Sequence, residues 1–200
     1  DADALNIIAE EGLDLSMLTE RSRSNVVITP HAAEMARLVN AFSGKNALKV
    51  TDIKNDPEGC AAEFSMRFNV TVVLKDAKTT VVTAAALIAA EATAGAVMSG
   101  NIETGETGLS AEAALRSEII CISSGSPAMA KAGSGDVLCG FIAGVSAVLS
   151  WELKDSVPLA AYMHGRAGSM AAQKKGVHSI LARDIAEHAN EAFLSASSGK

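Results

Sequence analysis

The chain has 200 residues, a formal net charge of −6, 48% hydrophobic and 20% charged residues. This length suits one α/β domain with a sizeable core, and the composition excludes an intrinsically disordered chain. The acidic balance argues against a nucleic-acid partner, because contact with a phosphate backbone requires a basic face and no basic cluster exceeds Lys174-Lys175.

Cysteine usage and the absence of targeting signals suggest a cytoplasmic protein. Cys60, Cys121 and Cys139 are odd in number and widely spaced, without a CxxC pair or a metal-ligand pattern. We therefore interpret them as reduced thiols and predict no dedicated metal site. The most apolar run, residues 81–90, is too short to span a bilayer, so we expect no membrane partner.

The first half of the chain alternates between apolar runs and amphipathic helices. The opening DADALN, without a methionine, is typical of a strand exit, so we expect the N-terminal part of the domain to lie upstream. After an apolar run at 26–28, Thr29 and Pro30 suit the N-cap and first residue of a helix that ends at Ser43-Gly44.

A second helix is predicted from Pro57 to about Asn69, followed by β-branched runs at 70–74 and 79–83. Helix followed by buried strand, twice over, predicts a mainly parallel sheet covered by helices.

The second half is less regular and then strongly helical. Residues 84–116 favour a helix, a glycine-containing loop and a short helix, which together we interpret as a surface excursion. Strand character returns at 119–122. Helical patterns follow from Gly135 onward, at 158–172 and at 179–193. With no internal repeat and no second boundary, residues 1–200 are interpreted as a single domain.

The clearest chemical signal is Gly133-Ser134-Gly135-Asp136, which comes after a loop and opens a strong helix. Glycines there let the backbone approach a ligand, and the first N–H groups of the helix attract anions. Two interpretations of Asp136 remain open. It can stabilise the helix dipole, or it can take a proton from a hydroxyl that attacks a bound phosphate.

The segment SGSPAMAKAGSGDVLCG, residues 124–140, resembles the nucleotide-site signature of the NAD(P)HX dehydratases in the ribokinase-like superfamily. That signature runs approximately TGNPGMATGG[ST]GDVLxG. Three further matches stand in the same order, DADALN at 1–6, ITPHxxEM at 28–35 and VVLK at 72–75. The resemblance covers nearly the whole chain except residues 84–116, and four ordered motifs make it specific.

The resemblance implies a three-layer α/β/α ribokinase-like fold that lacks its N-terminal part, with 84–116 as an insertion. It implies that Asp136 is catalytic and faces the hydrated nicotinamide, and that His31 also contacts this substrate. Nucleotide contacts are implied for Lys75, Asp76, Ala77, Lys78, Thr79, Gly133, Ser134 and Gly135. Without the family match, His31 is equally well an exposed residue of a first helical turn and Lys75 an ordinary strand-end lysine.

The implied activity is the removal of water from hydrated NADH or NADPH (NADHX or NADPHX), with ADP or ATP as co-substrate. The ring hydroxyl is phosphorylated and the phosphate is then eliminated, with Mg²⁺ neutralising the transferred charge. The family further implies a homo-oligomer, a tetramer, and an epimerase domain or partner. Two alternatives are a small-molecule kinase of the same superfamily and a nucleotide-binding module without catalysis.

The chain departs from the family pattern at four places. Ala32-Ala33 follow His31 where the family has Pro-Gly, and Asp76 stands in place of a glycine. Ser126 and Ala128 replace an asparagine and a glycine. Asp76 matters because a carboxylate beside phosphates repels them unless a cation intervenes, and the most serious departure is the missing upstream part of the family's domain.

Overall fold

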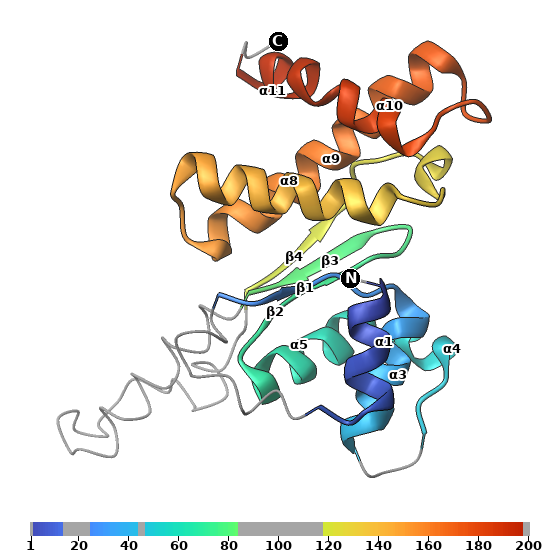
Figure 1. Ribbon diagram of the computed structural model, residues 1–200, viewed down its shortest axis with the longest axis vertical. Coiled ribbons are helices and arrows are strands. Elements are labelled where there is room, and N and C mark those ends of the chain that lie inside the picture. Colours follow the sequence, from blue (N-terminus) through green and yellow to red (C-terminus); the bar gives the residue numbers. More distant parts are fainter. Residues whose placement is uncertain (1, 14–24, 44–46, 84–117, 198–200) are drawn as a thin grey trace, which may run out of the picture.

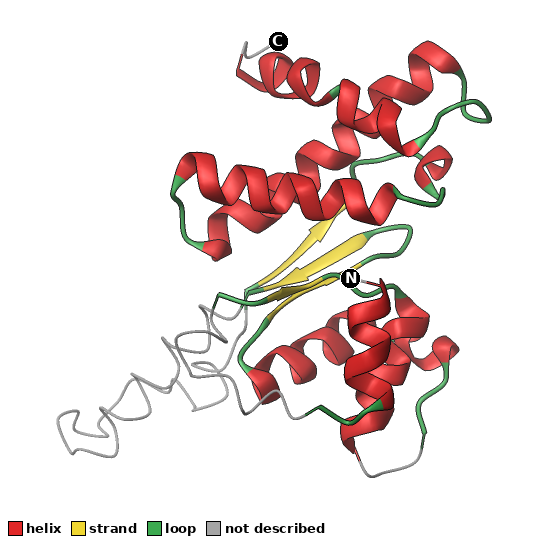
Figure 2. Ribbon diagram, viewed as in Figure 1, coloured by secondary structure: helices red, strands yellow, loops and turns green. Residues whose placement is uncertain are grey.

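The computed structural model describes residues 2–13, 25–43, 47–83 and 118–197, and shows a sheet enclosed between two layers of helices (Figure 1). Figure 2 shows the strands running between these two helical layers. One layer consists of α1 (Ala2–Glu10), α3 (Ala32–Ser43), α4 (Val50–Asn55) and α5 (Pro57–Phe68). The other consists of α8 (Ser134–Leu149), α9 (Leu153–Lys175), α10 (Ala182–Glu187) and α11 (Ala189–Ser197). The predicted three-layer α/β/α arrangement is confirmed.

The described sheet is mixed, so the prediction of a mainly parallel sheet is wrong for these strands. Its order is β1 (Val27–Ile28), β2 (Thr71–Leu74), β3 (Thr79–Val82) and β4 (Ile119–Ile122). β1 and β2 are parallel, whereas β2–β3 and β3–β4 are antiparallel. Only residues 75–78 join β2 to β3, and a parallel crossover needs a dozen residues or more.

Both faces of the sheet are buried, which explains its β-branched composition. Val72 and Leu74 of β2 belong to the core under the first helical layer, together with Met35 and Phe64. Val73 lies between them in sequence and belongs to the opposite core. Successive strand residues point to opposite faces, so one short strand contributes to both cores.

The bounds of α5 follow from local signals and match the prediction. Pro57 is its first residue, and the Asp56 side chain accepts a hydrogen bond from the Gly59 N–H at 2.9 Å. Asn69 ends the helix in the left-handed conformation, with φ 49°. Proline at the start and a left-handed asparagine at the end are typical helix boundaries.

The start of α3 differs from the prediction, because Thr29 and Pro30 do not begin the helix. α3 begins at Ala32, and Nδ1 of His31 accepts hydrogen bonds from the N–H groups of Ala33 and Glu34, each at 3.1 Å. An acceptor just before the first turn satisfies donors that have no intrahelical partner. His31 therefore performs the capping that the sequence assigned to Thr29.

The remaining expectations had mixed outcomes. β2, β3 and β4 form where strands were predicted, whereas α1 and α4 were not predicted. The helical pattern at 179–193 is divided between α10 and α11. Residues 84–116, interpreted as an insertion, lie outside the described residues. No helix in the described ranges is long and apolar enough to cross a membrane.

Helix α9 approaches the segment after β4 very closely. A Cβ atom on Gly165 would lie 2.5 Å from the backbone oxygen of Ser124. The Ser124 hydroxyl also donates a hydrogen bond to the Tyr162 carbonyl at 3.0 Å. Residue 165 must therefore lack a side chain if the helix is to reach this position.

Two glycine-to-alanine variants test this close approach. Gly165→Ala is expected to lower the free energy of unfolding by about 1–3 kcal/mol, because the methyl group overlaps backbone atoms. Gly140 in α8 has no atom within 4 Å of an added Cβ. Gly140→Ala should therefore raise stability by up to about 1 kcal/mol through helix propensity. Urea denaturation measures the free energy of unfolding of both variants. Equal values for Gly165→Ala and Gly140→Ala would contradict the packing described.

Candidate active-site cleft

A cleft of about 790 Å³ lies at the edge of the sheet where β1, β2 and β4 end. β1 and β2 are parallel, and two successive antiparallel pairings give β4 the same direction. The residues that follow β1 and β2 therefore meet. His31 pairs with Lys75 in a parallel bridge, and the Lys75 N–H donates to the Pro30 carbonyl at 2.8 Å.

The cleft brings together most of the site residues predicted from sequence. The predicted residues that line it are His31, Lys75, Asp76, Ala77, Thr79, Gly133, Ser134, Gly135 and Asp136. Lys78 belongs to the same β2–β3 turn but is not among the residues lining the cleft. Shared location does not test the roles assigned to these residues, which stay predictions.

The start of α8 lies in this cleft, as the glycine motif predicts. Gly133 precedes the helix with φ 83°, a left-handed conformation that disfavours other residues, and no side chain caps the helix. The Ser134 N–H donates to the Lys131 carbonyl at 3.2 Å. The next two N–H groups, of Gly135 and Asp136, have no acceptor among the described residues. Together with the helix dipole they favour an anion.

The segment between β4 and α8 is held by its own hydrogen bonds. The Ser126 hydroxyl accepts a hydrogen bond from the Ala128 N–H at 3.3 Å, at the start of the short helix η2 (Pro127–Met129). The Ser126 N–H lies 3.4 Å from the Met129 sulfur, which accepts from it. This segment forms one wall of the cleft and leads the chain to the start of α8.

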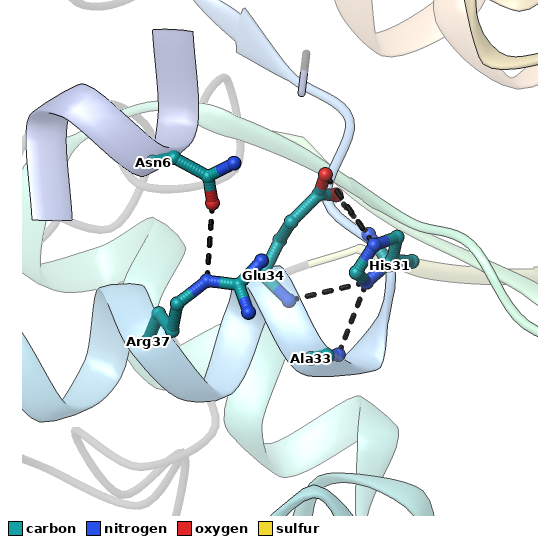
Figure 3. A network of polar contacts seen from close by, with 5 residues as sticks. All are labelled: Asn6, His31, Ala33, Glu34 and Arg37. Carbon is teal, nitrogen blue, oxygen red and sulfur yellow. Dashed lines mark hydrogen bonds and ion pairs between the residues drawn. The ribbon is translucent and has the colours of Figure 1, made fainter. Parts of the chain in front are cut away.

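His31 is oriented by Glu34, a cleft residue that the sequence analysis did not assign to the site (Figure 3). The Glu34 carboxylate accepts the His31 backbone N–H at 2.8 Å, and its other oxygen lies 3.4 Å from Nε2. Because Nδ1 already accepts two backbone N–H groups, the neutral ring carries its proton on Nε2. Glu34 is 5% exposed, whereas the His31 side chain is half exposed at the edge of the cleft.

The charged groups of the cleft influence one another. Burial lowers the pKa of Lys75, while electrostatic interactions with Glu34, Cys139 and Asp136 oppose that shift. The Asp76 carboxylate accepts the Ala77 N–H at 2.8 Å, so part of its hydrogen-bonding capacity stays within the turn. No three His, Cys, Asp or Glu side chains in the described ranges are grouped as a metal site requires.

His164 of α9 also lines the cleft and was not predicted from sequence. It is 8% exposed, and burial lowers its pKa from 6.5 to about 4. A hydrogen bond with the Ser134 backbone opposes that shift, and the Lys75 charge adds to it. The imidazole is therefore neutral at pH 7. A single histidine on an alanine-rich helix carries no sequence signal for such a place.

The His164 pKa predicts how stability depends on pH. As the pH falls below 6.5, the unfolded chain binds a proton that the folded ring resists until about pH 4. The contribution of His164 to the free energy of unfolding is therefore fully present above pH 6.5. It falls by about 3 kcal/mol as the pH is lowered to 4. The loss should be absent from His164→Gln. Urea denaturation of both proteins at pH 7, 5.5 and 4 measures it, and parallel pH profiles would contradict the assignment.

Comparison with known proteins shows which family the chain matches. Residues 1–109 and 110–191 match the family model described as NAD(P)H-hydrate dehydratase. A bifunctional NAD(P)H-hydrate repair enzyme of Moorella thermoacetica is 33% identical over 92% of this chain and 27% of its own length. An ADP-dependent (S)-NAD(P)H-hydrate dehydratase of Neisseria meningitidis is 29% identical over 93% of this chain and 49% of its own length. The chain thus spans half or less of these relatives.

Solved structures agree on the fold. The ADP/ATP-dependent NAD(P)H-hydrate dehydratase of Bacillus subtilis, co-crystallised with ATP and Mg²⁺, matches with a TM-score of 0.61 at 20% identity, over 85% of this chain and 47% of its own. A ribokinase-like superfamily protein of Enterococcus faecalis matches with a TM-score of 0.62 at 20% identity, over 94% and 49%. These likenesses confirm the expected ribokinase-like fold, of which this chain covers about half.

Proposed function

The chain belongs to the NAD(P)H-hydrate dehydratase family, and from this premise we propose that the complete protein removes water from hydrated NADH or NADPH with ADP or ATP as co-substrate. One observation carries the proposal. The uncapped start of α8, with the exposed carboxylate of Asp136, shares a single cleft with His31 and Lys75. An anion site beside a potential base is the arrangement that phosphoryl transfer to a hydroxyl requires.

In this proposal the nucleotide phosphates bind at the start of α8. The N–H groups of Gly135 and Asp136 donate to phosphate oxygens, and the Lys75 ammonium adds positive charge from the end of β2. The β2–β3 turn, which includes Asp76, Ala77 and Thr79 on the cleft, contacts the AMP part of the nucleotide. Lys78 of that turn contributes its charge from outside the cleft lining.

Asp136 accepts the proton of the substrate hydroxyl. The hydroxyl oxygen then forms a bond to the terminal phosphorus of the nucleotide, and the bridging P–O bond breaks. Hydroxide is a poor leaving group, but phosphate leaves the resulting ester readily, taking the C–O bonding electrons with it. Loss of a proton from the neighbouring ring carbon restores the double bond. Asp136 lies in the first turn of α8, and this position keeps its carboxylate at the phosphate site.

His31 binds the hydrated nicotinamide through the ring edge that faces the cleft. Because Glu34 and the first turn of α3 engage both ring nitrogens, His31 is held in one orientation and is a binding group, not a base. Glu34 acts through His31 and is a positioning residue in this proposal.

The donor set of the cleft fits Mg²⁺ bound with the nucleotide. Mg²⁺ sites of this kind use one or two carboxylates together with substrate phosphates, and Asp76 and Asp136 are exposed carboxylates on the cleft. When bound, the ion neutralises negative charge on the transferred phosphoryl group. The bound ion would also offset the repulsion expected between the Asp76 carboxylate and the phosphates.

We also propose that the complete protein is a homo-oligomer and that an epimerase domain or partner accompanies it. The relatives named bifunctional repair enzymes support the second point, since this chain covers 27% of the Moorella thermoacetica protein.

The direct test supplies hydrated NADH with ADP or ATP and Mg²⁺ and follows the return of dihydronicotinamide absorbance. In parallel, a nucleotide at a hundredfold excess over its dissociation constant should raise the free energy of unfolding by about 2.7 kcal/mol. Differential scanning fluorimetry of the complete protein measures this stabilisation. The proposal would be refuted if the complete protein showed no turnover and no thermal shift with either nucleotide.

Asp136→Asn separates catalysis from helix capping. Turnover should fall by a factor on the order of 10² to 10⁴, because the amide cannot take the hydroxyl proton. Nucleotide affinity should be retained or slightly raised, since repulsion of the phosphates is relieved. Stability should change by no more than about 1 kcal/mol.

Asp155→Asn is the matched control, because Asp155 is the third residue of α9 as Asp136 is of α8, and it does not line the cleft. The control should lose similar stability and no activity. If Asp136→Asn turns over within about threefold of the parent, the loss is far smaller than is typical for a general base. Asp136 would then be a helix-stabilising residue and not a base.

A further inference from the structure

We propose that Lys175 and Asp184 are positioning residues for the anion-binding start of α8, which their ion pair holds in place through the start of α10. The inference rests on the proposed function, because that proposal assigns the nucleotide phosphates to this place. Among the described residues, neither of the two lines the cleft, so they act without touching the bound phosphates. Any effect on nucleotide binding is therefore transmitted through the packing of α10 against Gly133.

The ion pair joins the end of α9 to the start of α10. The Lys175 ammonium donates to Oδ1 of Asp184 at 2.6 Å, and Oδ2 accepts the backbone N–H of Leu181 at 2.8 Å, just before α10 begins. The Asp184 side chain is 2% exposed, and Nε of the exposed Arg183 lies 4.0 Å from Oδ1. The hydrogen bonds from Lys175 and Leu181 lower the pKa of this carboxyl, so it is ionised at pH 7. A buried carboxylate needs such partners, and they fix its position.

The start of α10 packs against the residue that precedes α8. A Cβ atom on Gly133 would lie 3.1 Å from the Cβ atom of Ala182, the first residue of α10, so there is no room for a side chain at position 133. The Gly133 carbonyl accepts the Val137 N–H at 3.1 Å and so begins the hydrogen bonds of α8. Ala182 therefore limits where Gly133 can lie, and Gly133 sets the direction of the N–H groups of Gly135 and Asp136.

A second contact stabilises the segment that leads to α8. Ala128 of η2 belongs to a small apolar core whose other buried members are Ala171, Ala172 and Ile180. Ile180 is 1% exposed and lies between the two partners of the ion pair in the chain. The ion pair closes the connection between α9 and α10 over this core. It therefore holds two successive parts of the cleft wall, η2 and the start of α8.

The neighbouring lysine forms an ion pair of the same length and provides a matched control. The Lys174 ammonium lies 2.6 Å from the Glu191 carboxylate of α11, and both side chains are about half exposed. This pair joins α9 to α11, so its removal leaves the contacts of Asp184 in place. Lys174→Met and Lys175→Met remove the same charge from adjacent positions, and only the second breaks the link to α10.

Four variants of the complete protein test the role of the pair. Lys175→Met and Asp184→Asn each remove one charge of the pair, and the asparagine oxygen can still accept the Leu181 N–H. Lys175→Arg keeps a cation that can pair with the carboxylate, and Lys174→Met is the control. Calorimetry gives the dissociation constant of ADP with Mg²⁺, absorbance assays give KM and kcat for hydrated NADH, and urea denaturation gives the free energy of unfolding.

Lys175→Met and Asp184→Asn should each raise the dissociation constant of ADP by about two- to thirtyfold, the range for substitutions that act on a site without touching its ligand. The value of kcat should fall as well, because Asp136 lies in the same turn of α8. The KM for the hydrate should change least, since His31 holds that substrate from α3. Lys175→Arg should restore most of the ADP affinity, and Lys174→Met should bind ADP as the parent does.

A folded Lys175→Met protein with the ADP affinity of the parent would overturn the inference and leave the pair with a structural role alone. Equal losses of ADP affinity in Lys174→Met and Lys175→Met would also overturn it, because net charge would then explain both. If Lys175→Met does not fold, Asp184→Asn decides in the same way, since it leaves no buried charge unpaired. If the parent binds ADP but does not turn over the hydrate, the proposed function fails, while the ADP measurements still decide the role of the pair.

Discussion

The hydrogen bond from the Lys75 N–H to the Pro30 carbonyl extends the parallel pairing of β1 and β2 to the point where both strands end. Without it, His31 and Lys75, which are distant in sequence, would not lie next to each other. The two antiparallel pairings then turn β4 to the same direction, so the chain leaves β4 at the same edge and reaches α8 there. A ligand site at the carboxyl ends of like-directed strands is thus a consequence of strand direction and does not require an all-parallel sheet.

Charge in the cleft is balanced over short distances. The uncapped start of α8 and Lys75 are positive, and three carboxylates line the same space. These carboxylates have different environments. Glu34 is buried and receives the His31 N–H, Asp76 receives the Ala77 N–H, and Asp136 is exposed at the start of the helix. A protein of net charge −6 can still offer an anion site, since N–H groups and the ammonium groups of Lys75 and Lys131 act locally in the cleft.

Local signals predicted much of the local structure, and the errors have separate physical causes. Pro57 and Asn69 mark the ends of α5 because their backbone preferences need no partner. Thr29 failed as a cap because His31 provides a ring nitrogen at the right place, a choice that propensity alone cannot make. The glycine motif located the start of α8, but the burial of His164 depends on the packing of α9 against Ser124. Nothing in the sequence near His164 records that packing.

The departures from the family motif bear on whether the site is intact. Ser126, in place of asparagine, still begins η2 by accepting the Ala128 N–H. Ala33, in place of glycine, still donates its N–H to His31, because the bond needs only the backbone. Asp76 binds the Ala77 N–H and remains available to a cation that accompanies phosphates. Ser126, Ala33 and Asp76 therefore each take part in a local hydrogen bond at the position where the family has another residue. The alternative of a nucleotide-binding module without catalysis rests on these departures and on the missing upstream part of the domain, whereas the intact Gly133-Ser134-Gly135-Asp136 motif argues against it. A small-molecule kinase would need the same α8 start and the same Asp136, so the identity of the substrate is what distinguishes it from a dehydratase.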